Sequence, residues 1–307
     1  MRAMRIHEYG DASVICDDDV PRPVPGPDEV LIEVAGTSFN PSEIGLRRGL
    51  LRAFLPLDLP LTLGGEVAGT VVEVGTGVAT LTTGDRVVGR VDRGGAAAAY
   101  VAARADTFVT APTAIPLAHA AALPIAGLTA WQAVFEHANL TPGKRVLVNG
   151  AGGGVGGFTV QLARYAGAQV VATASPRSAD TVRRQGADHV IDYTTTPLAD
   201  ALDEPVDAIL HLVGGSALDA AALLPLLRPG GVLVSATVPV EVSAASPVRA
   251  VHFVASNDTD QLTALVKLVD AGDVQVDVTA SRAMSELADL HRDVEAGRTR
   301  GKVILVP

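Results

Sequence analysis

The chain has 307 residues, of which 48% are hydrophobic and 19% are charged, with a formal net charge of −10 and a single cysteine, Cys16. This length predicts about two domains, and the composition predicts large buried cores rather than disorder. The acidic balance argues against nucleic acid and anionic membrane surfaces as partners, and one cysteine excludes an internal disulfide and a cysteine-rich zinc site. Neither a signal peptide nor a membrane span is predicted, so we expect a cytoplasmic protein with no membrane partner.

The first part of the chain, up to about residue 115, is predicted to be rich in strands and turns. Strands fit at residues 29–34, 67–75 and 85–90, and glycines separate them. The proline-rich stretch 21–27 before the first of these strands must be extended or turning. Short strands with glycine between them favour a partly closed barrel over a layer of alternating strands and helices.

After about residue 116 the pattern changes to strands alternating with helices. The predicted strands are 145–149, 169–174, 189–193, 207–213, 231–237 and 249–255, and the predicted helices are 154–166, 177–186, 196–203 and 217–227. This alternation indicates a parallel, doubly wound sheet.

The tail leaves that alternation, with a helix predicted at 259–271, a strand at 277–282, a helix at 285–296 and a strand at 302–306. We therefore expect a nucleotide-binding domain, residues 118–255, inserted into a β-rich domain made of residues 1–117 and 256–307.

A glycine-rich turn follows the first predicted strand of the nucleotide domain. Gly150, Gly153 and Gly156 have the G-x-x-G-x-x-G spacing, and Gly154 and Val155 lie between them at the start of a helix. Glycines let a ligand approach the backbone closely, and the helix N-terminus presents N–H groups to an anion. A purely structural turn is the alternative, but the strand before it and the helix after it favour a dinucleotide-phosphate site.

The end of the second strand, residues 169–174, indicates which dinucleotide is bound. NAD sites place a carboxylate there for the ribose hydroxyls, but no Asp or Glu occurs between Gly150 and Asp180. Ser175 and Arg177 occupy the place instead, and a hydroxyl with a guanidinium suits a 2′-phosphate. A capping serine and a solvated arginine are the alternative, although the helix dipole disfavours arginine in a first turn. We expect NADP(H) rather than NAD(H).

Other candidates follow later strands of the predicted sheet. Val213 and Gly214 follow the fourth strand, where such sheets bind ligands, although glycines there are equally typical of a turn. Tyr193 ends the third strand and is placed to lie near the adenosine phosphate, with simple packing as the alternative. His211, on a strand predicted to be buried, is interpreted as a core histidine with its hydrogen bonds satisfied.

The chain resembles the medium-chain dehydrogenase/reductase superfamily, and specifically its zinc-free quinone oxidoreductase branch. The resemblance covers essentially the whole chain in order. It rests on Ser38–Glu43 (SFNPSE), Leu63–Gly69 (LGGEVAG), Gly84–Gly89 (GDRVVG), Gly127–Gln132 (GLTAWQ), the glycine turn and Arg300–Leu305 (RGKVIL). It implies a GroES-like β-rich catalytic domain with an inserted Rossmann domain.

The resemblance also implies a reaction without zinc. Zinc-dependent members carry a cysteine near residue 39 and a histidine beside the glutamate of a Gly-His-Glu motif, whereas this chain has Phe39-Asn40 and Gly65-Glu66. Zinc-assisted alcohol dehydrogenation is therefore not expected, and no metal site is predicted. Hydride transfer from NADPH to a small hydrophobic quinone or to the β-carbon of an enone remains.

Residues matching Asn40 and Thr129 lie near the nicotinamide in family members, where they would position groups rather than act as a general acid. The alternatives are a turn residue before Pro41 and a helix-cap hydroxyl. Phe253 and Val254 match a segment whose backbone meets the nicotinamide.

By the same resemblance, Arg300 or Lys302 is expected to reach a cofactor phosphate. Residues 44–60, including Arg47 and Phe54, are expected to line the substrate pocket. The tyrosine that related enoyl reductases carry as a possible proton donor is absent, and no general acid is evident.

Relatives often dimerise through the edge strand of the nucleotide domain, here Val248–Ala255, so a homodimer is expected. Three functions stay open at this point: a quinone or enone reductase, a 2-enoyl-thioester or biosynthetic tailoring reductase, and a non-catalytic NADPH-binding sensor protein.

Overall fold

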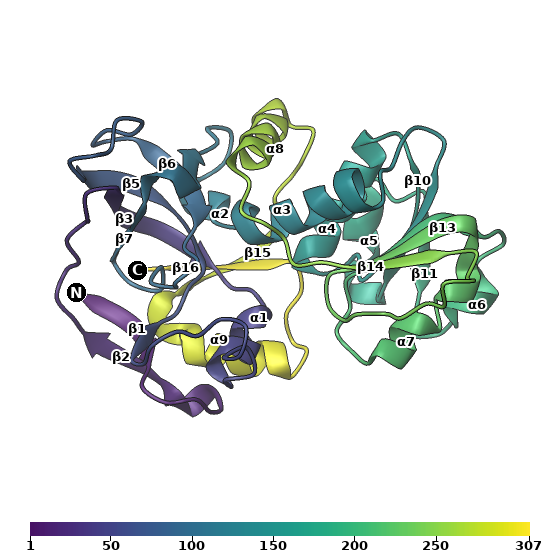
Figure 1. The fold of residues 1–307 in the computed structure, drawn as a ribbon, viewed down its shortest axis with the longest axis horizontal. Helices are drawn as coiled ribbons and strands as arrows, with labels where there is room; N and C mark the ends of the chain where they lie inside the picture. The colour runs from purple at the N-terminus through teal and green to yellow at the C-terminus, as the bar shows by residue number, and fades with distance from the viewer. The chain divides into compact units, whose positions relative to one another are not determined.

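The computed structural model describes residues 1–307, and the chain divides into two compact units (Figure 1). Unit 1 comprises Met1–Ile125, Asn257–Ala271 and Val278–Pro307, and unit 2 comprises Ala126–Ser256 and Gly272–Asp277. These boundaries differ from the expected ones at two places.

The first difference arises because one helical run, Leu117–His137, contributes residues to both units. The second arises because Gln161 fastens the short segment Gly272–Asp277 to unit 2. The Gln161 amide donates to the carbonyl of Gln275 at 2.9 Å and accepts the N–H of Gln275 at 2.7 Å.

Unit 1 is built on a seven-stranded sheet and a smaller three-stranded one, as the strand-rich pattern predicts. The larger sheet has the order β15-β16-β3-β5-β6-β8, with β7 also paired to β3, and the smaller has the order β2-β1-β4. The strands are β1 (Arg2–Ile6), β2 (Ile15–Asp19), β3 (Glu29–Ser38), β4 (Leu61–Thr62), β5 (Glu66–Val74), β6 (Arg86–Arg90), β7 (Tyr100–Arg104), β8 (Phe108–Thr110), β15 (Val278–Ala283) and β16 (Lys302–Val306).

The C-terminal strand β16 is paired inside this sheet, which confirms that the tail returns to the first domain. It runs antiparallel to β3, with Ile304 opposite Ser38. Val30, Leu31 and Ile32 of β3 are fully buried, so β3 is a central strand of unit 1. The helices of this unit are α1 (Ser42–Arg47), α2 (Leu117–Ala120), α8 (Thr259–Ala271) and α9 (Leu287–Glu295).

Unit 2 contains a six-stranded parallel sheet with the order β11-β10-β9-β12-β13-β14. Its strands are β9 (Arg145–Asn149), β10 (Gln169–Ala174), β11 (His189–Asp192), β12 (Val206–His211), β13 (Leu227–Ser235) and β14 (Arg249–His252). Each overlaps a predicted strand, and β9 and β10 coincide with theirs. Because the chain passes from β11 at one edge to β12 beside β9, the strand order reverses between β9 and β12.

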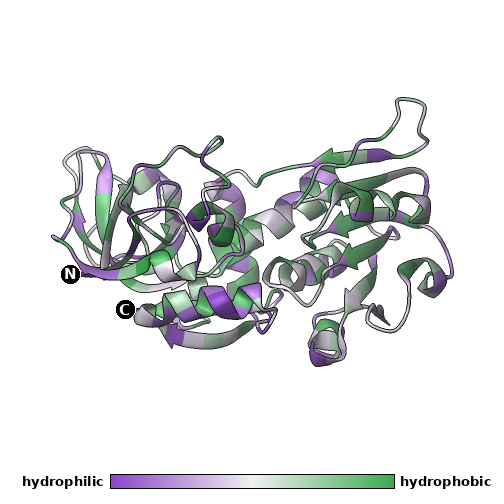
Figure 2. Ribbon diagram, turned by 90° about the horizontal axis from the view of Figure 1, so that it is seen from below, coloured by the Kyte–Doolittle hydropathy of each residue, from purple (hydrophilic) through white to green (hydrophobic).

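The helices of unit 2 cover both faces of this sheet, as a doubly wound fold requires. They are α3 (Leu128–Trp131), α4 (Gly154–Tyr165), α5 (Pro176–Arg184), α6 (Leu198–Ala201) and α7 (Ala217–Ala221). Figure 1 shows α4 and α5 on one side of the sheet and α6 and α7 on the other. Figure 2 shows apolar colouring along the strands and mixed colouring along the helices, as expected for helices that turn one face to a core.

The helical run Leu117–His137 is long and apolar enough to cross a membrane, but its most apolar window is 72% buried within the protein. A single helix of this kind is equally typical of a protein core.

Candidate functional site

The glycine turn of unit 2 joins β9 to α4 and has the close packing that a dinucleotide fingerprint requires. Gly150 has a φ of +101°, and its N–H donates to Thr173 Oγ1 at 2.9 Å. A Cβ at Gly156 would lie 2.2 Å from the carbonyl oxygen of Gly150. Only glycine fits at position 156, and the left-handed backbone at position 150 strongly favours glycine. The turn therefore brings the start of α4 directly against β9.

The backbone N–H groups in the first turn of α4 are not capped by any acidic side chain of the chain itself. Gly153 is the N-cap and supplies no side-chain cap, and no acidic residue lies in the first turn, which contains Gly154 and Val155. Unsatisfied N–H groups and the positive end of a 12-residue helix form an anion site. A phosphate group fits this arrangement.

The start of α5 lies next to the glycine turn. A Cβ at Gly152 would meet Ser178 Oγ of α5 at 2.5 Å. Ser175 is the N-cap of α5, but its side chain makes no capping bond, and the exposed Arg177 lies in the first turn. The structure thus places the hydroxyl and guanidinium that suggested a 2′-phosphate on the helix beside the phosphate cradle.

The remaining candidates in unit 2 follow the carboxyl ends of other strands of the same sheet. Tyr193 follows β11 and is 54% exposed, and Val213 and the exposed Gly214 follow β12. After β14, Val254 is 85% exposed, whereas Phe253 is buried with its ring 4.4 Å from that of His137. Such a sheet binds ligands at this edge, where its strand order reverses.

Three polar side chains at this edge form a chain of hydrogen bonds that the sequence did not reveal. Thr173 Oγ1 donates to Asn149 Oδ1 at 3.0 Å, and Asn149 Nδ2 lies 3.0 Å from His211 Nδ1. Burial lowers the pKa of His211, and the carboxylate of Asp219 opposes that effect. The expected hydrogen bonding of His211 is therefore found, but for only one of its ring nitrogens.

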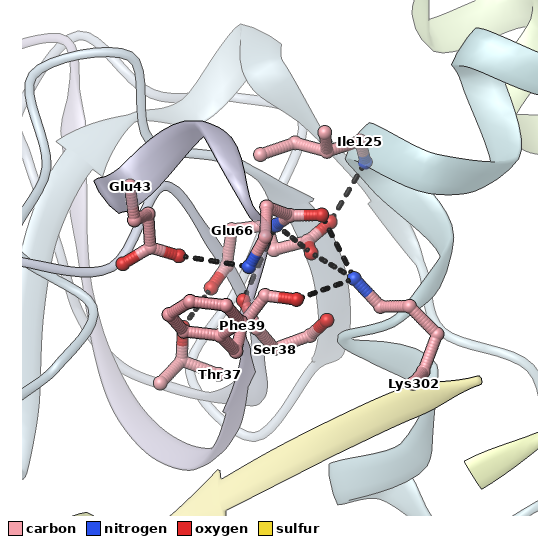
Figure 3. A network of polar contacts seen from close by, with 8 residues as sticks. Thr37, Ser38, Phe39, Glu43, Glu66, Ile125 and Lys302 are labelled. Atoms are coloured by element: carbon pink, nitrogen blue, oxygen red, sulfur yellow. Dashed lines mark hydrogen bonds and ion pairs between the residues drawn. The ribbon is translucent and has the colours of Figure 1, made fainter. Parts of the chain in front are cut away.

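A second polar centre lies inside unit 1, around the carboxylate of Glu66 (Figure 3). This fully buried group accepts from Asn40 Nδ2 at 2.6 Å and from the N–H of Ile125 at 2.7 Å, and it is ion-paired with Lys302 Nζ at 3.3 Å. Lys302 Nζ also donates to Asn40 Oδ1 at 2.8 Å and to the carbonyl oxygen of Phe39 at 3.0 Å. All three ammonium hydrogens of Lys302 thus have acceptors in the network.

Glu43 is a second buried carboxyl in this network. One of its oxygens accepts the N–H of Asn40 at 3.2 Å. Burial raises the pKa of Glu43 to about 7, and the nearby negative charge of Glu66 adds to the rise, while Lys302 and two backbone N–H groups oppose it. Near neutral pH this carboxyl is therefore divided between its protonated and ionised forms.

The network changes the interpretation of two predicted site residues. The ammonium of Lys302 is buried and fully hydrogen-bonded, so its placement differs from the expected contact with a cofactor phosphate. The carboxamide of Asn40 is likewise buried, and its Nδ2 group donates to Glu66 and to the carbonyl of Ser38. Both side chains hold the interior of unit 1 together. The signal available in the sequence was Glu66 itself, the one charged residue in the stretch 61–72.

The other predicted residues occupy varied positions. Thr129 is half-buried within α3 of unit 2, in the middle of a helical run rather than at its cap. Arg300 precedes β16 in unit 1, where its carbonyl accepts from Thr279 Oγ1 at 2.7 Å. Within segment 44–60, Arg47 is fully buried and paired with Glu295 at 2.7 Å, whereas Phe54 is 87% exposed. Arg47 thus belongs to the core of unit 1 and not to an open pocket wall.

No group of three or more His, Cys, Asp or Glu side chains is placed to hold a metal ion. The positions that carry ligands in zinc enzymes hold Phe39-Asn40 and Gly65-Glu66 in this chain. The carboxylate of Glu66 accepts hydrogen bonds from an amide and a backbone N–H and is ion-paired with an ammonium. These residues do not fit a catalytic zinc site.

Comparison with known proteins agrees with this architecture. Residues 26–113 match the family described as alcohol dehydrogenase GroES-like domain, and residues 185–305 match zinc-binding dehydrogenase. The chain is 34% identical to the chloroplast envelope quinone oxidoreductase homolog of Arabidopsis thaliana, over 100% of this chain and 98% of that one. It is 32% identical to the NADPH-dependent alkenal/one oxidoreductase of the same plant, over 100% and 80% of the two chains.

A solved structure of Escherichia coli quinone oxidoreductase complexed with NADPH superimposes with a TM-score of 0.89, at 26% identity and covering 100% of both chains. With the glycine turn, the inserted parallel sheet and the returning β16, these matches establish that the chain belongs to the quinone oxidoreductase branch of the medium-chain dehydrogenase/reductase superfamily.

Proposed function

We propose that this protein is an NADPH-dependent reductase that acts on a quinone or an α,β-unsaturated carbonyl without zinc. The observation that carries the proposal is the phosphate cradle of unit 2, with Ser175 and Arg177, and no acid, at the start of the helix beside it. Relatives named as quinone and NADPH-dependent alkenal/one oxidoreductases support the same reaction.

The glycine turn and the start of α4 would hold the pyrophosphate through backbone N–H groups. Ser175 and Arg177 would contact the 2′-phosphate, and Tyr193 would lie toward the adenosine half. Val213, Gly214 and the backbone of residues 253–254 would border the nicotinamide half. When bound, the cofactor supplies the hydride, so the chain is required chiefly to bind, orient and exclude water.

The zinc-free route rests on the donor set rather than on any empty site. Lys302 neutralises the charge of Glu66 and Asn40 donates a hydrogen bond to it, so no cluster of ligands remains to hold a metal that could polarise a carbonyl. A quinone needs little electrophilic assistance, and an enolate formed from an enone can take its proton from water. Asn40 is then a positioning residue that fixes the loop between β3 and α1.

Turnover assays distinguish the three candidate functions. Loss of the NADPH absorbance is followed with benzoquinone, phenanthrenequinone and crotonyl-CoA as acceptors. We expect turnover with the quinones. Turnover with crotonyl-CoA alone would instead indicate a 2-enoyl-thioester or tailoring reductase. Tight NADPH binding without turnover of any acceptor would indicate a non-catalytic sensor protein.

Arg177→Ala tests the choice of cofactor. Loss of a charged contact to the 2′-phosphate should weaken NADPH binding by about tenfold or more and leave NADH binding unchanged. Arg183→Ala is the matched control, because Arg183 lies on the same helix but in its last turn, paired with Asp180. Equal losses for the two cofactors would show that the 2′-phosphate is bound elsewhere.

We further propose that β14, the edge strand of the sheet in unit 2, pairs with its copy in a homodimer. Light scattering at micromolar concentration should give twice the chain mass, and a single species of monomer mass would refute the dimer. The expected cytoplasmic location stays a prediction, because the Arabidopsis alkenal/one relative is named as chloroplastic.

A further inference from the structure

A chain of hydrogen bonds joins the carboxyl ends of three neighbouring strands in unit 2. The N–H of Gly150, just after β9, donates to Thr173 Oγ1 on β10 at 2.9 Å. Thr173 Oγ1 bonds to Asn149 Oδ1 at 3.0 Å, and Asn149 Nδ2 bonds to His211 Nδ1 on β12 at 3.0 Å. We call Thr173, Asn149 and His211 the relay.

The orientation of the Asn149 carboxamide sets the direction of the bonds in the relay. A backbone N–H can only donate, so Thr173 Oγ1 accepts from Gly150, and its own hydroxyl hydrogen goes to Asn149 Oδ1. With Oδ1 facing Thr173, the carboxamide turns its Nδ2 group toward His211. An amide nitrogen also only donates, so His211 Nδ1 accepts and carries no hydrogen. The neutral imidazole therefore holds its hydrogen on Nε2.

Two features keep this ring neutral at pH 7. Burial lowers the pKa of His211, outweighing the opposite effect of the Asp219 carboxylate. A second ring hydrogen on Nδ1 would also point at the Asn149 amide hydrogens, so protonation breaks the relay. His211 is thus a neutral imidazole in one tautomer.

The Nε2 hydrogen is available to a ligand. The bond to Asn149 is the one hydrogen bond of the His211 ring within the chain. Nε2 has no hydrogen-bond partner, and it is not fully buried. His211 ends β12, directly opposite Asn149 at the end of β9, where the strand order reverses. A dinucleotide crosses such a sheet at this point, with its adenosine half over the first three strands and its other half over the second three.

We propose that His211 is a cofactor-binding residue that donates its Nε2–H to an oxygen of the nicotinamide-ribose half of NADPH. The relay sets the tautomer in advance, so the donor is in place before the ligand arrives. This inference rests on the proposed NADPH site and adds to it a side-chain contact that the glycine turn does not supply.

Calorimetric titration of the full chain tests the contact with two ligands. NADPH contains the nicotinamide half, whereas 2′,5′-ADP contains only the adenosine half. His211→Leu should weaken NADPH binding about tenfold and leave 2′,5′-ADP binding unchanged, as expected for one lost hydrogen bond. His211→Gln retains an N–H donor and should lose much less. His189→Gln is the control, an exposed histidine at the amino end of β11 in the same sheet.

Unchanged NADPH affinity in His211→Leu would overturn the proposal, as would an equal loss for both ligands. A wild-type protein that binds 2′,5′-ADP but not NADPH would overturn it as well. A wild-type protein that binds neither ligand would remove the proposed function and this inference together.

Nitrogen-15 NMR of the ligand-free protein gives a readout that is independent of activity and of binding. The imidazole signals of His211, identified by their absence in His211→Gln, should show the hydrogen on Nε2. A hydrogen on Nδ1 would mean that Asn149 presents its oxygen to the ring, and the proposed donor would not exist. Thr173→Val removes the hydroxyl that fixes Asn149 and should convert this signal into that of a tautomer mixture.

Discussion

The polar centre of unit 2 is built around backbone groups, whereas that of unit 1 is built from side chains of distant segments. At the glycine turn, residues 150–156 present N–H groups with almost no side-chain bulk. In unit 1, Asn40, Glu66 and Lys302 meet in the interior with their charges paired. The first arrangement leaves donors for a ligand, and the second satisfies its donors internally. A polar cluster is therefore a candidate binding site only where its hydrogen bonds are left incomplete.

Gly156→Ala would break the first arrangement and should have the largest effect. The new Cβ would lie 2.2 Å from the carbonyl oxygen of Gly150, and a backbone atom cannot move aside cheaply. We expect NADPH binding to be lost and the free energy of unfolding to fall by more than about 4 kcal/mol. Gly45→Ala is the control, because Gly45 lies on α1 of unit 1 and its Cβ would meet only the side chain of Leu51, at 3.6 Å. Titration calorimetry and urea unfolding measure both effects, and normal NADPH binding by Gly156→Ala would contradict the role of the turn.

Lys302→Met would break the second arrangement by leaving Glu66 buried without its cation. Removing one partner of a buried pair costs about 3–5 kcal/mol of stability. The double variant Lys302→Met with Glu66→Gln should recover a large part of that loss, because the uncompensated charge is gone. Lys267→Met, at an exposed position on α8, should change stability by less than about 0.5 kcal/mol. Urea unfolding measures all three, and no recovery in the double variant would show that Lys302 acts mainly through packing.

Glu43→Gln sharpens the comparison by removing the group in unit 1 that titrates near neutrality. The folded pKa of about 7 lies above the usual 4.5, so the unfolded chain releases this proton first as the pH rises. The stabilising contribution is complete below pH 4.5 and is lost as the pH rises to about 7, amounting to about 3 kcal/mol.

Glutamine keeps the acceptor for Asn40 but does not titrate. Glu43→Gln should therefore gain stability relative to the wild type between pH 4.5 and pH 8, and the exposed Glu8→Gln should not. A stability difference that is independent of pH would disprove the raised pKa.

Thr37→Val probes a single neutral hydrogen bond and should have the smallest effect. Thr37 is buried, and its hydroxyl donates to the carbonyl oxygen of Glu66 at 2.6 Å. Its loss should cost about 1 kcal/mol of stability and leave NADPH affinity unchanged. Thr110→Val, at the exposed end of β8, is the control for β-branched replacement. A clear change in NADPH affinity for Thr37→Val would mean that the network of unit 1 acts on the cofactor after all.

The sequence by itself determined the parts of this protein that depend on neighbouring residues. Alternating strands and helices predicted the sheet of unit 2, with β9 and β10 at their observed bounds, because periodicity and turn residues act locally. The glycine turn and the acid-free start of α5 were likewise evident, since both depend on residues a few positions apart.

Only the tertiary structure decided which polar side chains meet. Lys302 reaches Asn40 and Glu66 because β16 pairs with β3, a contact across more than 250 residues that no local pattern encodes. The same holds for His211, whose tautomer depends on Thr173 and Asn149 in two other strands. Hydrogen-bond partners are set by strand order and register, and these are properties of the folded sheet rather than of any segment of the chain.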